Sequence, residues 1–226
     1  MKLITGATSP FGARITIAAR IKGIVLECVR PPAAGITSPE YLAVNPVGKI
    51  PVLVTDNDQV IPESEAILDY LEDRFPSPAL RPRDPEQRAR INVAIRMVDT
   101  YVMAPVIRTF PHLDPARRDA KVVEGELKRW KEGLAALEHF MRTPLPTAEG
   151  GLSMVDCVLP PSLHLSARIS MMLDLDEDLL APHAALMAYY SRIKADPIVG
   201  PILRDLTLAQ SESDVKAGRP SLAARH

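Results

Sequence analysis

The sequence predicts a small α/β domain followed by an all-helical domain, and three observations support this prediction. Short apolar strands alternate with helices only in the first third of the chain, in the order βαβ and then ββα. A proline-rich stretch then breaks the pattern, and beyond it apolar residues recur at helical spacing without a convincing strand. We expect an α/β domain over residues 1–76, a linker over 77–85, a helical domain over 86–210 and a disordered tail over 211–226.

The first three elements form a predicted βαβ unit. Residues 2–5 read as a strand, and Ser9 is placed to cap a helix that ends near Lys22. Pro10 then occupies the first helical position, where its missing N–H costs nothing. Residues 24–29 form a second, almost wholly apolar strand that we expect to be buried on both faces. Two strands joined by a helix of this length favour parallel pairing.

An antiparallel hairpin and a helix complete the predicted α/β domain. Residues 51–55 and 59–61 read as strands joined by a short polar turn, and residues 63–75 read as the helix that follows. Pro51 opens its strand, a position where the loss of one ladder hydrogen bond is tolerated. The bond between Ile50 and Pro51 is therefore a candidate for the cis form.

The second domain is expected to contain helices only. Asp114 with Pro115 gives one clear helix start, and Ser153 with Asp156 has the spacing of a capping box before an apolar run. The predicted helices cover residues 86–109, 115–142, 153–172, 182–195 and 197–206.

Composition excludes several classes of function. A net charge of -1 argues against a nucleic-acid-binding protein, and no apolar run approaches the roughly 20 residues that span a membrane. No signal peptide is visible, so the expected location is the cytoplasm. Cys28 and Cys157 stand far apart, which fits neither a metal site nor a disulfide framework and predicts two reduced, largely buried thiols. We expect no bound metal.

Few residues have a pattern that points to chemistry. Ser9 lies at a helix N-terminus, where the positive helix end stabilises an anion such as a thiolate, although a simple N-cap explains it equally well. A serine hydrolase would need a G-x-S-x-G elbow and a histidine partner, and the sequence shows neither. Glu63 and Ser64 begin the next helix and satisfy ordinary capping preferences. Lys49 has the ordinary alternative of a solvated surface lysine.

Three motifs occur in this chain, each at the start of a predicted helix or strand. Ser9-Pro-Phe-Gly12 opens the first helix, Asn45-Pro-Val-Gly-Lys-Ile-Pro-Val-Leu53 leads into the third strand, and Glu63-Ser64-Glu-Ala-Ile67 opens the next helix. This combination resembles the cytosolic glutathione transferase family, over nearly the whole chain. The resemblance implies a thioredoxin-like first domain, glutathione as co-substrate and a homodimer.

The resemblance also implies a role for each residue of these motifs. Ser9 would donate a hydrogen bond to the glutathione sulfur and hold it as thiolate. Ile50 would pair its backbone with the cysteinyl part of glutathione, presented by cis-Pro51. Glu63 and Ser64 would bind the ammonium and carboxylate of the γ-glutamyl part, and Lys49 would meet the glycyl carboxylate.

The same comparison bears on the type of chemistry. Ser9 and Gly12 stand where thiol-bearing relatives have the two cysteines of Cys-Pro-x-Cys. Activation of a bound thiolate is therefore expected rather than a mixed disulfide on the protein. Asp156 would be structural.

The resemblance leaves several activities open. The first is transfer of glutathione to an electrophilic small molecule, as in detoxification. The same thiolate would also serve disulfide reduction, peroxide reduction or cis–trans isomerisation, although the zeta-type isomerase string Ser-Ser-Cys-Ser is missing. A non-catalytic interaction protein on this fold is the alternative of another class. The acceptor pocket, beside helix 86–109, would be lined by residues whose spacing also fits plain packing: Phe11, Met97, Tyr101, Met103 and Arg108.

Overall fold

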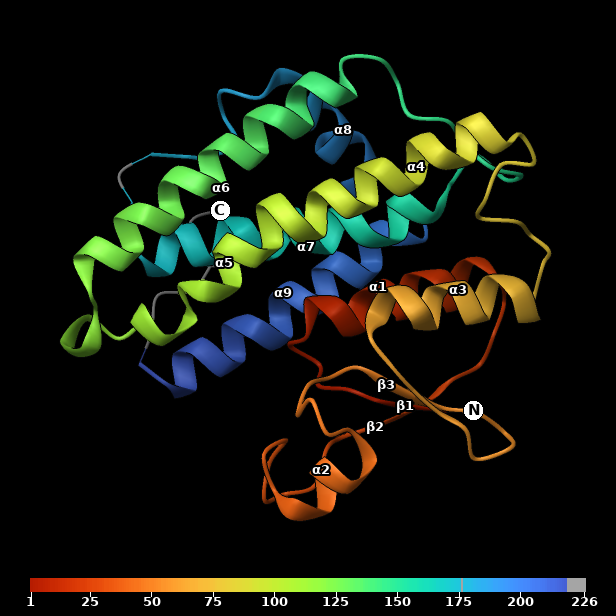
Figure 1. Ribbon diagram of the computed structural model, residues 1–226, viewed down its shortest axis with the longest axis horizontal. Helices are drawn as coiled ribbons and strands as arrows, with labels where there is room; N and C mark the ends of the chain where they lie inside the picture. The colour runs from red at the N-terminus through yellow and green to blue at the C-terminus, as the bar shows by residue number, and fades with distance from the viewer. Residues whose placement is uncertain (176, 219–226) are drawn as a thin grey trace.

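The computed structural model describes residues 1–175 and 177–218 (Figure 1). Its N-terminal part contains one four-stranded sheet with the strand order β2-β1-β3-β4. β1 pairs in parallel with β2, and the pairs β1–β3 and β3–β4 are antiparallel. The strands are β1 Lys2–Ile4, β2 Glu27–Val29, β3 Val52–Val54 and β4 Val60–Pro62.

Two helices cover one face of this sheet, and the helical domain packs on them from the other side. α1 (Pro10–Ile21) and α3 (Ser64–Arg74) lie side by side, whereas the short α2 (Pro39–Val44) lies at the far end of the sheet (Figure 1). This arrangement confirms the predicted thioredoxin-like domain with its βαβ and ββα order.

The rest of the described chain is helical and is organised around α7 (Met154–Met172). α7 is buried along nearly its whole length and contacts α1, α4, α8 and α9. Its capping box is present, since the Asp156 carboxylate accepts hydrogen bonds from the Ser153 backbone N–H at 2.7 Å and hydroxyl at 3.1 Å. The other helices are α4 Pro85–Met97, the π-helix η1 Val98–Met103, α5 Ala104–Arg108, α6 Ala120–Met141, α8 Ala184–Lys194 and α9 Val199–Lys216, with 3-10 turns η2 Phe110–His112 and η3 Pro115–Arg117.

The predicted linker is firmly attached to both domains. The Lys22 ammonium contacts the Glu72 carboxylate at 2.6 Å and donates to the carbonyls of Phe75, at the end of α3, and Pro78, in the linker. Glu72 accepts hydrogen bonds from the backbone N–H groups of Leu80 and Arg81, and the Leu80 carbonyl accepts one from Met154. The segment is therefore ordered by buried charge-assisted hydrogen bonds at the junction of the domains.

Four details of the sequence prediction are wrong. The second strand is not buried on both faces: it covers only residues 27–29, lies at the sheet edge, and leaves Val25 91% exposed just before it. Cys28 is consequently exposed, whereas Cys157 is buried as expected. The helix predicted over 115–142 breaks before α6, which begins after the N-cap Asp119.

The fourth correction concerns the tail. A disordered tail from residue 211 is wrong for its first part, because α9 continues to Lys216 with Asp214 buried. An ion pair with Arg168 satisfies this buried carboxylate, with 2.9 Å between Nε and Oδ2. Residues 219–226 lie outside the described residues. Within the part of the chain that the structure describes, no helix has the length and apolarity that crossing a bilayer requires.

Candidate functional site

The sheet register brings the three predicted site segments to one edge of the molecule. Ile4 pairs with Val52 across β1 and β3, and Val52 pairs with Pro62 across β3 and β4. These three residues form one row, with neighbouring strands about 4.8 Å apart. The loop that leads to Ser9 begins after Ile4, at the end of β1. Pro51 directly precedes Val52 of β3, and Glu63 directly follows Pro62 of β4. The register therefore brings the strand ends that lead to these three residues to the same end of the sheet.

Ser9 is the N-cap of α1. Its Oγ accepts a hydrogen bond from the Gly12 N–H at 3.1 Å, so the capping role that the sequence suggested is present. A serine hydroxyl has one donor and two acceptor lone pairs, so the cap uses only an acceptor and leaves the proton available. Capping and donation to a bound anion are thus compatible.

Gly12 is required by close packing at the start of α1. A Cβ at this position would lie 2.1 Å from Oγ1 of Thr5, at the end of the preceding strand. A side chain at this position would require the Thr5 side chain to move.

The loop before Pro51 is held from inside by two side chains. The Asn45 amide donates to the Lys49 carbonyl at 2.8 Å and accepts from the Val47 N–H at 3.1 Å, and the Tyr41 hydroxyl donates to the same carbonyl at 2.6 Å. The bond between Ile50 and Pro51 is cis, as the sequence indicated. Lys49 is exposed, so its ammonium is free to reach a ligand at this edge.

The start of α3 has the features of an anion site. Glu63 is exposed, adopts a positive φ of 68°, and makes no side-chain capping bond. Positive φ is uncommon for residues other than glycine, and such conformations concentrate at functional sites. Ser64 follows as the first helical residue and is buried. Its hydroxyl and the free N–H groups of the first turn favour a bound carboxylate.

A buried arginine, Arg14, lies behind Ser64 and contacts its hydroxyl. Arg14 is 1% exposed and donates to both carboxylate oxygens of Asp99, at 2.6 and 3.1 Å. It also donates to the hydroxyls of Ser162 at 2.8 Å and Ser64 at 3.4 Å, and it lies 4.5 Å from the centre of the Phe11 ring. One side chain therefore joins α1, α3, η1 and α7 directly beneath the site.

Sequence reasoning missed Arg14, although a signal was present. Arg14 is four residues before Ala18, on the face of the helix that the apolar residues mark as buried. A charged residue on such a face is rarely buried without a partner, so it predicts an ion pair. The partner Asp99, 85 residues away, has no such signal.

The residues expected to line an acceptor pocket do not gather in one place. Tyr101 and Arg108 share the lining of a hollow of about 260 Å³ between η1, α5 and α6. Met103 is a core residue with 1% of its surface exposed, which leaves it no surface to offer a substrate. Met97 packs against the core, and Phe11 packs against Arg14.

Comparisons with known proteins agree with this architecture. Residues 3–79 match the family described as glutathione S-transferase, N-terminal domain. The chain is 30% identical over 188 residues to the maleylacetoacetate isomerase of Pseudomonas aeruginosa, covering 77% of this chain and 85% of that protein. The chain belongs to the cytosolic glutathione transferase family.

Two further family members extend the comparison. Glutathione S-transferase U8 of Arabidopsis thaliana is 34% identical over 140 residues, covering 61% of this chain and 59% of that protein. The crystal structure of glutathione transferase URE2P6 from Phanerochaete chrysosporium, in complex with oxidized glutathione, aligns with a TM-score of 0.78 at 19% identity. That alignment covers 92% of this chain and 96% of the other, and it supports the fold.

Proposed function

We propose that this protein is a glutathione transferase that binds glutathione along the sheet edge and activates it as thiolate for attack on an electrophilic small molecule. The observation that carries this proposal is the register row of Ile4, Val52 and Pro62, from which the Ser9, Ile50–Pro51 and Glu63–Ser64 segments project together. Each segment offers what one part of a γ-glutamyl tripeptide requires: a hydroxyl donor, backbone groups just before β3, and a helix N-terminus with a serine.

Ser9 acts as a hydrogen-bond donor in this proposal. A thiol with a pKa of about 8.5 is only about 3% ionised at pH 7, and lowering its pKa by about two units makes it mostly thiolate. That shift corresponds to roughly 2.7 kcal/mol, which one charge-assisted hydrogen bond and the end of a helix dipole can supply together. Serine cannot be the base, because its own pKa is far too high. The proton leaves the thiol for solvent, and the hydroxyl stabilises the resulting anion.

The proposal also assigns the binding groups. Ser64 and the first-turn N–H groups of α3 hold the γ-glutamyl carboxylate, and the exposed Glu63 carboxylate pairs with the γ-glutamyl ammonium. Ile50 pairs its backbone with the cysteinyl part, and Lys49 meets the glycyl carboxylate. Arg14 is a positioning residue, since it reaches the ligand only through Ser64.

The test is a titration of thiolate absorbance of bound glutathione against pH, for the wild type and two variants. Ser9→Ala removes the hydroxyl and the cap, whereas Ser9→Gly removes the hydroxyl at little capping cost. We expect a depressed thiol pKa in the wild type and a near-normal one in both variants, with glutathione still bound. If the thiol of bound glutathione has a normal pKa in the wild type, Ser9 acts only as an N-cap. Failure of glutathione to bind would favour a non-catalytic interaction protein.

Isomerisation is the second candidate reaction, and the similarity to maleylacetoacetate isomerase over 85% of that protein favours it. The missing Ser-Ser-Cys-Ser string speaks against it. Transfer and isomerisation differ in their use of glutathione: a transferase consumes one thiol per product, whereas an isomerase regenerates it. Counting free thiols during turnover of maleylacetoacetate and of a chloronitrobenzene therefore separates these two reactions. Reductase activity is tested with a disulfide substrate, by the appearance of glutathione disulfide.

We further propose a cytoplasmic homodimer that acts in detoxification. The family resemblance supports the dimer, and the two cysteines, both free, fit a reducing compartment. Sedimentation at several protein concentrations tests the dimer. A monomer across that range would contradict it.

A further inference from the structure

The loop that leads to Ser9 is a tight turn bonded to a side chain from the last helix. Ala7 and Thr8 form the turn, and the Ser9 N–H closes it by donating to the Gly6 carbonyl at 3.0 Å. The Thr8 carbonyl accepts a hydrogen bond at 2.9 Å from the side-chain amide of Gln210 on α9, 202 residues away. Thr8 is exposed, whereas Gln210 is 1% exposed. A buried side chain therefore holds an exposed turn.

This hydrogen bond fixes the peptide unit between Thr8 and Ser9. Its carbonyl is bonded to Gln210 and its N–H to the Gly6 carbonyl, so the plane of the peptide is held at both ends. The orientation of this plane sets φ of Ser9, which is -84°, and with it the direction of the hydroxyl. The other hydrogen bonds of residues 6–9 within the described chain join groups no more than four residues apart. Gln210 is thus the contact that relates the direction of Ser9 to the helical domain.

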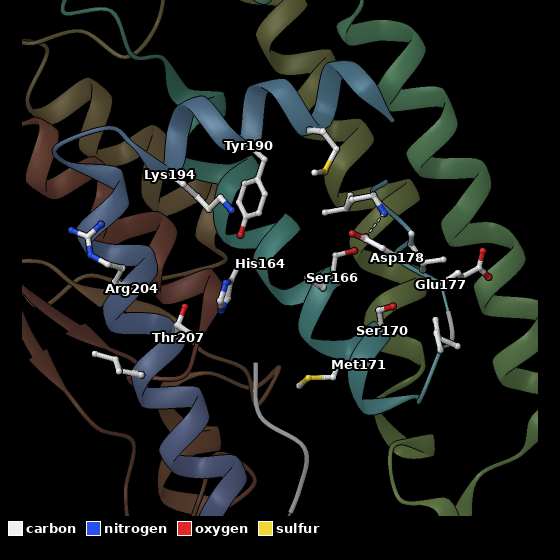
Figure 2. Close-up of a pocket in the computed structure, with 16 residues that line it drawn as sticks. His164, Ser166, Ser170, Met171, Glu177, Asp178, Tyr190, Lys194, Arg204 and Thr207 are labelled. Atoms are coloured by element: carbon white, nitrogen blue, oxygen red, sulfur yellow. Dashed lines mark hydrogen bonds between the residues drawn. The ribbon is translucent and has the colours of Figure 1, made fainter. Parts of the chain in front are cut away.

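His164 on α7 decides which way the Gln210 amide points. A backbone carbonyl only accepts hydrogen bonds, so the amide nitrogen of Gln210 must face Thr8 and its oxygen must face His164. Nε2 of His164 lies 3.0 Å from that oxygen and therefore carries a proton. Burial lowers the pKa of His164 to about 4, and the nearby charges of Arg168 and Lys194 act in the same direction, so the ring is neutral at pH 7. Figure 2 shows His164 pointing from α7 toward α9.

Gln210 is shielded from solvent on the side of His164. His164 lines a cavity of about 700 Å³ between α7, α8 and α9, together with Lys194 and Arg204 (Figure 2). Gln210 does not line this cavity and is almost fully buried, so water competes little for its amide. A hydrogen bond in such surroundings is stronger than one that water can replace.

A second polar contact ties the same part of α9 to α7. Arg168 donates to both carboxylate oxygens of Asp214, with 2.9 Å between Nε and Oδ2. Residues 164 and 168 are one turn apart on α7, and residues 210 and 214 are one turn apart on α9. The ion pair therefore anchors α9 beside Gln210 without contacting the turn itself.

We infer that Gln210 is a positioning residue for Ser9: by holding the Thr8 carbonyl, it directs the Ser9 hydroxyl toward the sulfur of bound glutathione. The inference rests on the proposed function, because it concerns the direction in which Ser9 donates. It gives α9 a part in thiol activation, exerted through the backbone of Thr8.

The test is the pKa of the thiol of bound glutathione in Gln210→Met, measured by the absorbance titration described above. Methionine is as long and unbranched as glutamine but cannot donate to the Thr8 carbonyl. We expect the thiol pKa to rise by about one unit, a roughly tenfold change in the ionisation constant. The affinity for glutathione should stay within about twofold of the wild type, because the groups proposed to bind its ends lie on other segments.

Arg168→Met/Asp214→Leu is the matched control. It removes the neighbouring contact between α7 and α9, leaves no buried charge unpaired, and keeps the hydrogen bond to Thr8. The thiol pKa should be that of the wild type in this variant. An equal rise in the control would mean that any loosening of α9 has this effect, and it would overturn the specific role of Gln210. Circular dichroism shows that each variant is folded.

Combination with Ser9→Gly shows whether Gln210 acts through Ser9. In the Ser9→Gly protein, Gln210→Met should raise the thiol pKa no further, and a further rise of the same size would overturn the inference. If Ser9→Gly alone leaves the thiol pKa unchanged, the proposed function fails and the inference with it. If Ser9→Gly raises the thiol pKa and Gln210→Met does not, only the inference fails.

Deuterium exchange of the backbone amides gives a readout that needs no glutathione. In Gln210→Met, the amides of residues 6–13 should exchange at least about fivefold faster than in the wild type, because the turn opens more often. The control variant should keep the wild-type rate in this segment. Unchanged exchange in Gln210→Met would show that Gln210 does not hold the turn, and the inference would be wrong.

Discussion

Replacing Arg14 by methionine should destabilise the protein by about 3 kcal/mol. The guanidinium is buried and bonded to the Asp99 carboxylate at 2.6 and 3.1 Å, with Ser162 as a third partner. Loss of one member of a buried ion pair typically costs about 3–5 kcal/mol, since the other charge is left without compensation. Asp99 is 26% exposed and regains some hydration, so the lower end of this range applies.

A double-mutant cycle separates the ion pair from other effects of the substitution. In Arg14→Met/Asp99→Leu no carboxylate remains unpaired, so we expect the double variant to be more stable than the sum of the single losses by about 1.5 kcal/mol. Urea unfolding gives each free energy, followed by circular dichroism and by the fluorescence of Trp130, the single tryptophan, on α6. Additive single effects, with a coupling below about 0.5 kcal/mol, would refute the idea that this pair joins the domains.

Three further predictions concern other parts of the fold. Gly133→Ala should destabilise the protein by roughly 3 kcal/mol in thermal unfolding, because its Cβ would lie 2.0 Å from a backbone oxygen of η1. Gly125→Ala is the control on the same helix. Its Cβ would lie 3.6 Å from the nearest atom, so this variant should be as stable as the wild type or more stable. Asn45→Ala should cost about 2 kcal/mol in urea unfolding and weaken glutathione binding, since it removes two hydrogen bonds that the buried Asn45 side chain makes to the loop before Pro51. The exposed Asn92→Ala should change neither. The folded pKa of His164, about 4, is below its unfolded value of 6.5, so the unfolded chain binds the proton first and stability falls as pH drops from 6.5 toward 4. His164→Asn should remove up to about 3 kcal/mol of that fall, and an unchanged pH dependence would contradict the assignment.

Local interactions account for the parts of the fold that could be predicted. Ser9 caps α1 and Ser153 forms its capping box with Asp156, because each pattern involves groups within three residues of one another. Pro51 before its strand similarly predicted the cis bond that the structure contains. The structure places the three motifs next to strand ends that lie at one end of the sheet, and their roles toward glutathione stay predictions.

Position in the tertiary structure decided what the sequence could not. The apolar run at 24–29 suggested a strand buried on both faces, yet β2 is an edge strand, because burial depends on the order of strands in the sheet and not on hydrophobicity alone. The π-helix η1 interrupts a segment that reads as one regular helix. Pro105 accounts for its place, since an interior proline clashes with the carbonyl four residues earlier.

The sequence by itself determined the thioredoxin-like and helical parts of the fold and the helix caps. These depend on periodicity and on contacts within one or two helical turns. Only the tertiary structure showed that Arg14 unites both domains beneath Ser64, that Asp214 extends α9, and that Lys194 and Arg204 share a cavity. The first two rest on contacts between residues 46 to 85 positions apart, and no local pattern encodes which distant partner will compensate a charge. Lys194 and Arg204 have no acidic partner among the described residues, and this too can be seen only once the helices have packed.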